Sequence, residues 1–347
     1  MNLIDAYAAM KPKEPLQHFQ YKSRELTAKD VQIEVLFCGI CHSDIHQARD
    51  EWGLGIFPMV PGHEITGRVT KVGSAVTKFK IGDAVGVGCM VDSCHDCLSC
   101  AEGLEQYCEQ GATFTYNAQY RDTGLPTYGG YSKQMLVRED FVLKIPENLP
   151  LDKAAPLLCA GITTYSPLKN WKVKQGDKVG VIGLGGLGHM ALKIAAALGA
   201  EVTVISRSPK KKEDAFRLGA KGYLDSSVVE QMQAKNNYFD FIINTVSANL
   251  ELALYLSLLK RDATLVQVGV PDKPNTLDMF PIVLKRRRLA GSLIGGIKET
   301  QEMLDFCGKH NITSEIELIP VNKINAAYER VLNSDVRYRF VIDMKSL

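Results

Sequence analysis

Four cysteines and one histidine occur in a twelve-residue stretch, CMVDSCHDCLSC, at residues 89–100. With a later cysteine they give the spacing C-x2-C-x2-C-x7-C, formed by Cys94, Cys97, Cys100 and Cys108. Gaps of two residues let successive thiolates turn toward one point, and a fourth thiolate completes a tetrahedron around a single ion. Because four thiolates leave no open coordination position, the spacing predicts a structural zinc in a loop lobe at residues 89–110.

Two other roles are open to the same cysteines. Similar spacing holds iron–sulfur clusters in ferredoxins, and thiols in a polar loop can act as redox pairs. A single compact lobe favours one zinc ion over a cluster. Cys89 lies outside the spacing, and we interpret it as a small apolar residue of the interior.

A second group of metal-binding residue types is spread over three short motifs. GICHSDIH at 39–46 contains Cys41, Ser43, Asp44 and His46, PGHE at 61–64 contains His63 and Glu64, and PLLCAGIT at 156–163 contains Cys159. Each of these residues, taken alone, could be a buried thiol, a helix cap or a surface histidine. Spacing alone therefore cannot select ligands among them.

The segment GLGGLG at residues 183–188 fits the pattern G-x-G-x-x-G, follows KVGVI and precedes HMALKIAAALGA. In this strand-turn-helix context, Gly183 would make the turn, Gly185 would admit a pyrophosphate, and Gly188 would let the helix approach the sheet. The helix N-terminus would face the negative charge. The motif predicts dinucleotide binding, with close helix–strand packing as the alternative.

The end of the next strand-like run, EVTVIS, bears on the choice between NAD and NADP. An Asp or Glu there would bind the ribose 2′-hydroxyl of NAD, and it would repel a 2′-phosphate. The run ends instead in Ser206, Arg207 and Ser208, and three lysines follow at 210–212. Hydroxyls and cations can bind a phosphate, so we predict NADP(H).

These motifs lie in two regions with different hydrophobic patterns. Between residues 31 and 137, short alternating runs are broken by Gly and Asp, which is typical of β structure. From Asp152 onward, strand-like and helix-like runs alternate, which indicates βαβ units and a parallel sheet. The strand-like tail RYRFVIDM is expected to rejoin the first region. With 347 residues, two domains are expected.

Composition and charge bear on whether the protein binds nucleic acid or a membrane. The chain has 41 basic and 39 acidic residues and a formal net charge of +2, which gives no electrostatic reason to expect nucleic acid or an anionic membrane. The apolar stretch at 179–200 is rich in glycine, so we interpret it as strand, turn and helix rather than a membrane span. No secretory signal is visible, which favours the cytoplasm. Disulfides are rare there, so metal binding is the leading role for the nine cysteines.

In this order along the chain, G-x-C-H-S-D-x-H, P-G-H-E, the four-cysteine lobe, C-A-G-I-T and G-L-G-G-L-G resemble the motifs of the zinc-dependent medium-chain alcohol dehydrogenases. Within that family, the chain is most similar to the cinnamyl alcohol dehydrogenases and the bacterial NADP-dependent aldehyde reductases. The resemblance runs from about residue 30 to the C-terminus and includes GSLIGGIKETQEMLDF at 291–306.

The resemblance implies an α/β fold with a β-rich domain. A GroES-like β-barrel catalytic domain would span residues 1–151 and 291–347, and a Rossmann cofactor domain with a doubly wound parallel sheet would span 152–290. It also implies two zinc ions per chain, one catalytic and one structural, and a homodimer.

The same resemblance implies roles for the dispersed residues. Cys41, His63 and Cys159 would hold the catalytic zinc and leave its fourth position for water or substrate oxygen. Asp44 would accept the other ring proton of His63. Glu64 stands where the family has an acid that can approach the metal.

For proton transfer, the resemblance points to Ser43 beside the substrate oxygen and to His46 as a relay toward solvent. The implied cofactor contacts are Thr163, Gly183, Gly185, Gly186, Leu187, Gly188, Ser206, Arg207, Ser208, Lys211, Ser292 and Ile294. Trp52, Phe114 and Ile294 would line an apolar substrate pocket. Plant cinnamyl enzymes have a tryptophan at the position of Phe114, so a strict preference for lignin-type substrates is not implied.

We therefore predict a zinc enzyme that transfers hydride between NADP(H) and primary alcohols or aldehydes, chiefly in the reduction of aldehydes, including aromatic and cinnamyl-type ones. Its expected partner is a small molecule rather than nucleic acid or a membrane. A polyol dehydrogenase is an alternative, although these enzymes usually carry an acid after the second cofactor strand. A zinc-stabilised nucleotide sensor without turnover is another, and it would lack the catalytic zinc.

Overall fold

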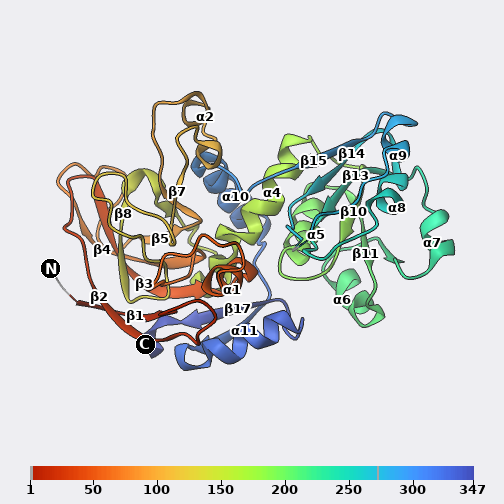
Figure 1. Ribbon diagram of the computed structural model, residues 1–347. Helices are drawn as coiled ribbons and strands as arrows, with labels where there is room; N and C mark the ends of the chain where they lie inside the picture. The colour runs from red at the N-terminus through yellow and green to blue at the C-terminus, as the bar shows by residue number, and fades with distance from the viewer. Residues whose placement is uncertain (1–2, 272) are drawn as a thin grey trace. The chain divides into compact units, whose positions relative to one another are not determined.

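The computed structural model describes residues 3–271 and 273–347 and divides into two compact units (Figure 1). Unit 1 comprises Met1–Cys159 and Gly295–Leu347, and unit 2 comprises Ala160–Ile294. The domain limits predicted from the sequence, after residues 151 and 290, lie before both of these boundaries. The predicted limits of the catalytic and cofactor domains therefore remain a prediction.

A seven-stranded sheet forms the centre of unit 1, in the order β16-β17-β3-β4-β5-β9 with β8 paired to β3. Its strands are β3 (Asp30–Gly39), β4 (Ile65–Val72), β5 (Ala84–Val87), β8 (Gln134–Arg138), β9 (Leu143–Lys144), β16 (Ile316–Pro320) and β17 (Arg339–Asp343). Val31, Ile33 and Val35 of β3 are all buried, as expected for the alternating run on a strand with one face in the core. Antiparallel pairing of β17 with β3 joins the C-terminal tail to this sheet.

Shorter elements surround this sheet in unit 1. The remaining strands are β1 (Leu3–Ala8), β2 (Gln17–Lys22), β6 (Met90–Asp92) and β7 (Thr113–Phe114). The helices are α1 (His42–Ala48), α2 (Leu98–Ala101), α3 (Leu151–Ala154), α10 (Ile297–His310) and α11 (Ile324–Leu332). Strands β1 and β2 pair with each other, as do β6 and β7. Helix α1 follows β3 directly, which places its first turn at the end of a central strand.

A six-stranded parallel sheet forms the centre of unit 2, in the order β12-β11-β10-β13-β14-β15. Its strands are β10 (Lys178–Ile182), β11 (Glu201–Ser206), β12 (Gly222–Asp225), β13 (Phe239–Asn244), β14 (Leu259–Gln267) and β15 (Arg288–Gly291). Counted from the first strand, this order is 3-2-1-4-5-6, which defines the doubly wound dinucleotide-binding sheet. The predicted Rossmann architecture is therefore confirmed.

One helix precedes the strands of unit 2, and the others connect them. They are α4 (Ala160–Asn170), α5 (Gly188–Ala197), α6 (Lys212–Arg217), α7 (Val229–Gln233), α8 (Leu252–Ser257) and α9 (Phe280–Val283). Residues 179–200 form β10, a turn and α5, as predicted. Within the described residues, no helix is long and apolar enough to cross a membrane.

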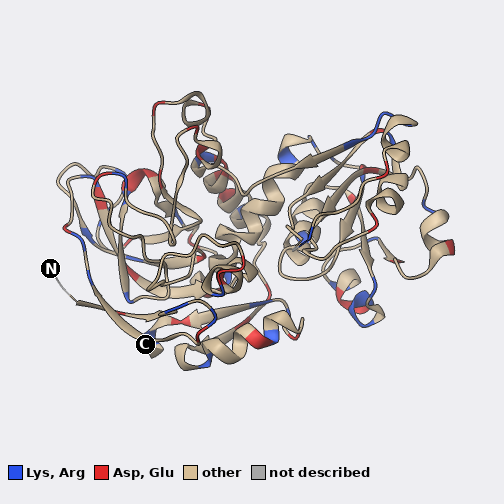
Figure 2. Ribbon diagram, viewed as in Figure 1, with Lys and Arg blue, Asp and Glu red and all other residues tan. Residues whose placement is uncertain are grey.

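Charged residues of both signs are interspersed along the ribbon of each unit (Figure 2). The basic run at 284–288 illustrates this mixing. Arg286 pairs with Asp262, and the buried Arg287 donates to backbone carbonyls of Leu259 and Pro281, each at 2.8 Å. These two arginines therefore have structural partners in unit 2.

Candidate functional site

Three motifs far apart in sequence meet in unit 1. Cys41 is the N-cap of α1 at the end of β3, and His63 lies just before β4, the antiparallel neighbour of β3. Cys159 follows the 3-10 turn Ala155–Leu158. Ligand atoms of these three residues and of Glu64 all lie within 4.8 Å of one another, and the four residues are buried. Strand pairing thus brings together the set that spacing could not select.

The donor set of this cluster fits a zinc ion that keeps one position open. Two sulfurs and one imidazole are a ligand set found in catalytic zinc sites. Cys41 Sγ and Cys159 Sγ are 3.9 Å apart, close enough to share one ion. The hydrogen bond with Cys159, helped by the positive charge of Arg339, holds the pKa of Cys41 well below its usual value although burial opposes this. A thiolate, the form that binds metal, is therefore favoured at Cys41.

Asp44 orients this ligand set from the first turn of α1. Its fully buried carboxylate accepts hydrogen bonds from Cys41 N at 2.8 Å, Gly62 N at 3.1 Å, His63 Nδ1 at 3.0 Å and the Tyr131 hydroxyl at 3.2 Å. Because His63 donates through Nδ1, its Nε2 is free to bind a metal. The role predicted for Asp44 agrees with this geometry, whereas Tyr131 was not foreseen.

Glu64 lies beside the ligands and pairs with an arginine from the C-terminal tail. Its Oε1 is 3.0 Å from Arg339 Nη2, and both side chains are buried. Burial raises the pKa of Glu64 to about 8, although the charge of Arg339 opposes the shift. The Cβ of any larger residue at Gly39 would lie 2.0 Å from Glu64 Oε2, so this glycine makes room for the acid. Nothing in the tail sequence singled out Arg339.

The residues predicted to move protons flank the ligand cluster. Ser43 Oγ is 3.8 Å from Cys41 Sγ. The ring of His46 stacks on Trp52 with centroids 5.2 Å apart, and its Nδ1 contacts the carboxylate of Glu51. Within the described residues no hydrogen bond links Ser43 to His46. Glu51 was missed because an acid in a polar turn carries no local signal.

Four of the five cysteines of residues 89–110 form the second cluster. Ligand atoms of Cys94, Cys97, Cys100 and Cys108 all lie within 4.8 Å of one another. Backbone N–H groups point at three of the sulfurs, from Cys94 to Cys108 at 3.4 Å, from Cys97 to Cys94 at 3.4 Å and from Glu109 to Cys97 at 3.5 Å. Four clustered sulfurs, three of which accept from backbone N–H groups, fit a closed, structural zinc site.

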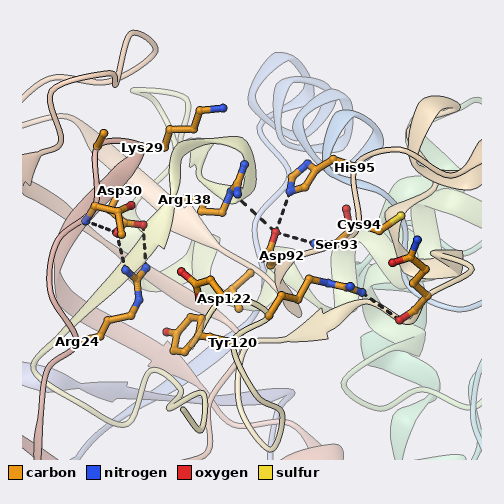
Figure 3. Close-up of a pocket in the computed structure, with 15 residues that line it drawn as sticks. Arg24, Lys29, Asp30, Asp92, Ser93, Cys94, His95, Tyr120, Asp122 and Arg138 are labelled. Carbon is orange, nitrogen blue, oxygen red and sulfur yellow. Dashed lines mark hydrogen bonds and ion pairs between the residues drawn. The ribbon is translucent and has the colours of Figure 1, made fainter. Parts of the chain in front are cut away.

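A pocket of about 530 Å³ lies beside this lobe (Figure 3). Several of its polar groups pair with one another: Arg24 donates to Asp30 at 2.5 and 2.8 Å, and His95 Nε2 lies 2.8 Å from Asp92. Arg121 Nη2 donates to the carbonyl of Gln110 at 3.1 Å and approaches Cys108 Sγ at 3.9 Å. Arg138, the last residue of β8, lies 3.9 Å from Asp92 through its Nε, and this ion pair joins the lobe to the sheet.

Cys89, which we expected in the interior, is only half-buried. Its Sγ is 3.9 Å from the carbonyl of Leu158, and its thiol interacts with Cys159. It therefore lies next to the dispersed ligand set and does not belong to the four-cysteine cluster.

The glycine motif of unit 2 has the geometry that a pyrophosphate requires. Gly183 has φ +87°, so it makes the turn that larger residues avoid. A Cβ on Gly185 would meet nothing within 4 Å, whereas a Cβ on Gly188 would lie 2.1 Å from the Gly183 carbonyl oxygen. Gly186 and Leu187 complete the turn into α5. Open space at Gly185 and tight packing at Gly188 fit a bound dinucleotide.

The predicted 2′-phosphate residues lie at the end of β11 and just after it. Ser206 and Ser208 are partly exposed and Arg207 is exposed. Lys211 Nζ donates to the carbonyl of Leu184 at 2.8 Å, so it links this loop to the glycine motif. Asp225, which pairs in register with Ser206, was not foreseen, and it accepts hydrogen bonds from Ser227 at 2.6 and 2.9 Å.

The remaining predicted contacts are divided between the units. Thr163 is buried on α4, and Ser292 N donates to Gln267 at 3.2 Å just after β15. Ile294 has φ +37° and is buried in unit 2. Trp52 and Phe114 belong to unit 1 and are 48% and 42% exposed. Half-exposed aromatic side chains are available to a ligand, and their substrate role stays a prediction.

The parallel sheet, the glycine motif and two cysteine-rich ligand sets define a zinc-binding dehydrogenase. A family model described as "Alcohol dehydrogenase GroES-like domain" matches residues 27–147, and one described as "Zinc-binding dehydrogenase" matches 186–309. The chain belongs to the zinc-binding alcohol dehydrogenase family. The predicted family and the predicted GroES-like and Rossmann fold class are confirmed.

Individual relatives cover the whole chain. It is 58% identical over 348 residues to the NADP-dependent alcohol dehydrogenase C 1 of Mycolicibacterium smegmatis, with 100% of this chain and 99% of that protein covered. It is 54% identical to the probable mannitol dehydrogenase of Fragaria ananassa, with 97% and 94% covered. A crystal structure of the cinnamyl alcohol dehydrogenase of Helicobacter pylori complexed with NADP(H) matches with TM-score 0.93 and 46% identity, covering 99% of this chain and 98% of that one.

Proposed function

We propose that this protein is a zinc-dependent, NADP(H)-linked dehydrogenase that interconverts primary alcohols and aldehydes, chiefly by reducing aldehydes. The observation that carries the proposal is the buried cluster of Cys41, His63 and Cys159. These three ligands leave the fourth zinc position to a substrate oxygen. When bound, zinc supplies a Lewis acid for that oxygen, and NADP(H) supplies or accepts the hydride.

The chain's own residues would orient the zinc ligands and transfer a proton between the substrate oxygen and solvent. Asp44 keeps the His63 proton on Nδ1, which leaves Nε2 to the metal. The Ser43 hydroxyl lies beside Cys41 and can exchange a proton with the substrate oxygen. His46 and Glu51 extend toward solvent, since the His46 side chain is 11% exposed and that of Glu51 is 38% exposed. We propose that this pair carries the proton out.

The loop after β11 supports NADP(H) as the cofactor. The hydroxyls of Ser206 and Ser208 and the guanidinium of Arg207 suit a phosphate. The chain's similarity to an alcohol dehydrogenase named as NADP-dependent also favours this choice. The acid of this region, Asp225, lies on β12 and accepts from Ser227 through Oδ1, and residues 206–212 contain no Asp or Glu.

We also propose a homodimer paired through unit 2. Strand β15 is the edge of its sheet, and an unpaired edge can pair with a second copy. Nearby on α9 and just after it, Phe280, Val283 and Leu284 are 70–71% exposed, which is unusual for apolar side chains outside an interface. Light scattering that gives the mass of one chain would contradict the dimer.

A cytoplasmic location is the corresponding proposal for the cell. Within the described residues all nine cysteines are free of disulfides, and free thiols together with thiolate metal sites suit a reducing compartment. Fractionation of the source cells tests the proposal, and recovery in a secreted fraction would overturn it.

A rate screen combined with a metal count tests the function. Benzaldehyde, cinnamaldehyde, a short aliphatic aldehyde and fructose are each reduced with NADPH and with NADH, and zinc is measured per chain. We expect two zinc ions and the highest kcat/KM for an aldehyde with NADPH. Preference for fructose would instead support a polyol dehydrogenase. One zinc ion and no turnover would indicate a nucleotide-binding protein.

A further inference from the structure

The loop that follows β11 is folded around the hydroxyl group of one tyrosine. Tyr223 lies on β12 and pairs in register with Val204 of β11. Its hydroxyl donates to the carbonyl oxygen of Ser208 at 2.7 Å and lies 3.3 Å from the carbonyl oxygen of Ser206. Both carbonyls that flank the exposed Arg207 therefore point toward the same phenol.

Other hydrogen bonds hold the loop in the same conformation. The backbone N–H of Ser226 donates to the Ser206 carbonyl at 3.2 Å, and Ser208 N donates to Ser206 Oγ at 3.2 Å. At the far end of the loop, Lys211 Nζ donates to Leu184 in the glycine motif at 2.8 Å. The loop is thus fixed at one end by β12 and at the other by the cofactor turn.

The orientation of these carbonyls matters because a carbonyl oxygen carries partial negative charge. A carbonyl turned toward a 2′-phosphate would repel it, whereas a carbonyl held by Tyr223 faces inward. Partial burial, with the nearby Asp225 charge, raises the pKa of Tyr223, and the Ser206 hydrogen bond only partly opposes this. The hydroxyl thus remains a donor through the neutral range.

We propose that Tyr223 is a specificity-determining residue for NADP(H), which positions Ser206–Ser208 so that Arg207 and the serine hydroxyls, and not the backbone carbonyls, face the 2′-phosphate. This inference rests on the proposed function, since it concerns the cofactor named there. In this proposal Tyr223 contacts neither the substrate nor the atoms between which the hydride passes. It acts only through the loop, so it is a positioning residue.

A purely structural tyrosine would behave differently. If its hydroxyl only stabilised unit 2, its removal would lower the melting temperature and weaken NADPH and NADH equally. Positioning of the phosphate loop predicts a selective effect, because NADH has a hydroxyl where NADPH has the phosphate. The ratio of the two dissociation constants therefore separates the two roles.

The test is Tyr223→Phe in the zinc-loaded protein, which keeps the ring and removes one donor. Dissociation constants of NADPH, NADH and 2′,5′-ADP are measured by calorimetry, and folding is checked by thermal unfolding. One hydrogen bond corresponds to a factor of about 5 in affinity. We expect Kd for NADPH and 2′,5′-ADP to rise about 5-fold while Kd for NADH changes less than about 2-fold.

Two further variants provide controls. Tyr238→Phe removes another hydroxyl from unit 2, and that hydroxyl has no hydrogen-bond partner in the described part of the chain. It should leave all three constants unchanged. Arg207→Asp places a carboxylate in the loop and should reverse the preference for NADPH over NADH. This result would show, independently of Tyr223, that the loop binds the 2′-phosphate.

The possible results distinguish the two proposals. If the unaltered protein does not prefer NADPH, the cofactor assignment in the proposed function is wrong and the inference falls with it. If the protein prefers NADPH, Arg207→Asp reverses this, and Tyr223→Phe leaves the ratio unchanged, the proposed function stands and the role of Tyr223 is refuted. An equal loss for both cofactors also refutes it.

Discussion

Asp44→Asn is the substitution that most directly tests how the dispersed zinc ligands are held. Oδ1 of Asp44 accepts from Gly62 N and His63 Nδ1, and Oδ2 accepts from Cys41 N and the Tyr131 hydroxyl. Asparagine has the same shape but replaces one oxygen with an NH2 group. Two of the four donors must then face another donor.

The two orientations of the amide differ in cost. With NH2 on the Oδ1 side, the ring of His63 loses its acceptor and can shift its proton to Nε2, which removes a metal ligand. With NH2 on the Oδ2 side, the Tyr131 hydroxyl can rotate and accept, so only Cys41 N is left unsatisfied. One buried unsatisfied donor costs about 1–3 kcal/mol. We expect the unfolding free energy to fall by that amount, and zinc affinity to fall about 10- to 100-fold because a partner of a ligating histidine is changed.

Chelator competition and urea unfolding measure these two quantities. Zinc content should fall from two toward one ion per chain as chelator is raised, at a concentration that leaves the unaltered protein loaded. Tyr131→Phe is the matched control, since it removes one donor and leaves the other three hydrogen bonds of Asp44 in place. If Asp44→Asn kept its zinc as tightly as Tyr131→Phe, the orienting role of Asp44 would be wrong.

Three other substitutions test the remaining parts of the scheme. Cys41→Ser should abolish turnover. Its Kd for NADPH, measured by fluorescence titration, should change less than about 2-fold, because the dinucleotide turn lies in unit 2. Retained turnover would contradict the catalytic role of the zinc. Cys97→Ser should remove one zinc ion and lower the melting temperature, and a fully stable lobe without metal would show that the ion is not structural. The third is Asp30→Asn: burial raises the pKa of Asp30, but hydrogen bonds from Arg24 and Thr27 outweigh it and hold the pKa below its ordinary value of 3.8. The stabilisation by ionised Asp30 is therefore present above that pH and is lost as pH falls through the lower folded pKa. Asp30→Asn should lower the free energy of unfolding by about 2 kcal/mol at pH 7 and leave it unchanged in strong acid. Equal urea midpoints of the two proteins at pH 7 would disprove this role of Asp30.

The sequence by itself determined those parts of the protein whose residues lie close together along the chain. The four cysteines of the lobe lie within residues 94–108, so the spacing of these ligands fixes their meeting point. The glycine motif is equally local, since strand, turn and helix follow one another directly in GLGGLG and its flanks. Alternation of hydrophobic residues likewise predicted β3, and the alternation of strand-like with helix-like runs predicted the parallel sheet of unit 2.

Tertiary structure alone decided which distant residues share a site. Cys41 and Cys159 are 118 positions apart, and they meet because the end of β3, the start of β4 and the turn before Cys159 lie at one place. Arg339 reaches Glu64 only because β17 pairs with β3. Tyr223 reaches the loop after β11 only because β12 lies beside that strand. Strand order is set by the burial of many side chains at once, so no single motif carries the information that joins these groups.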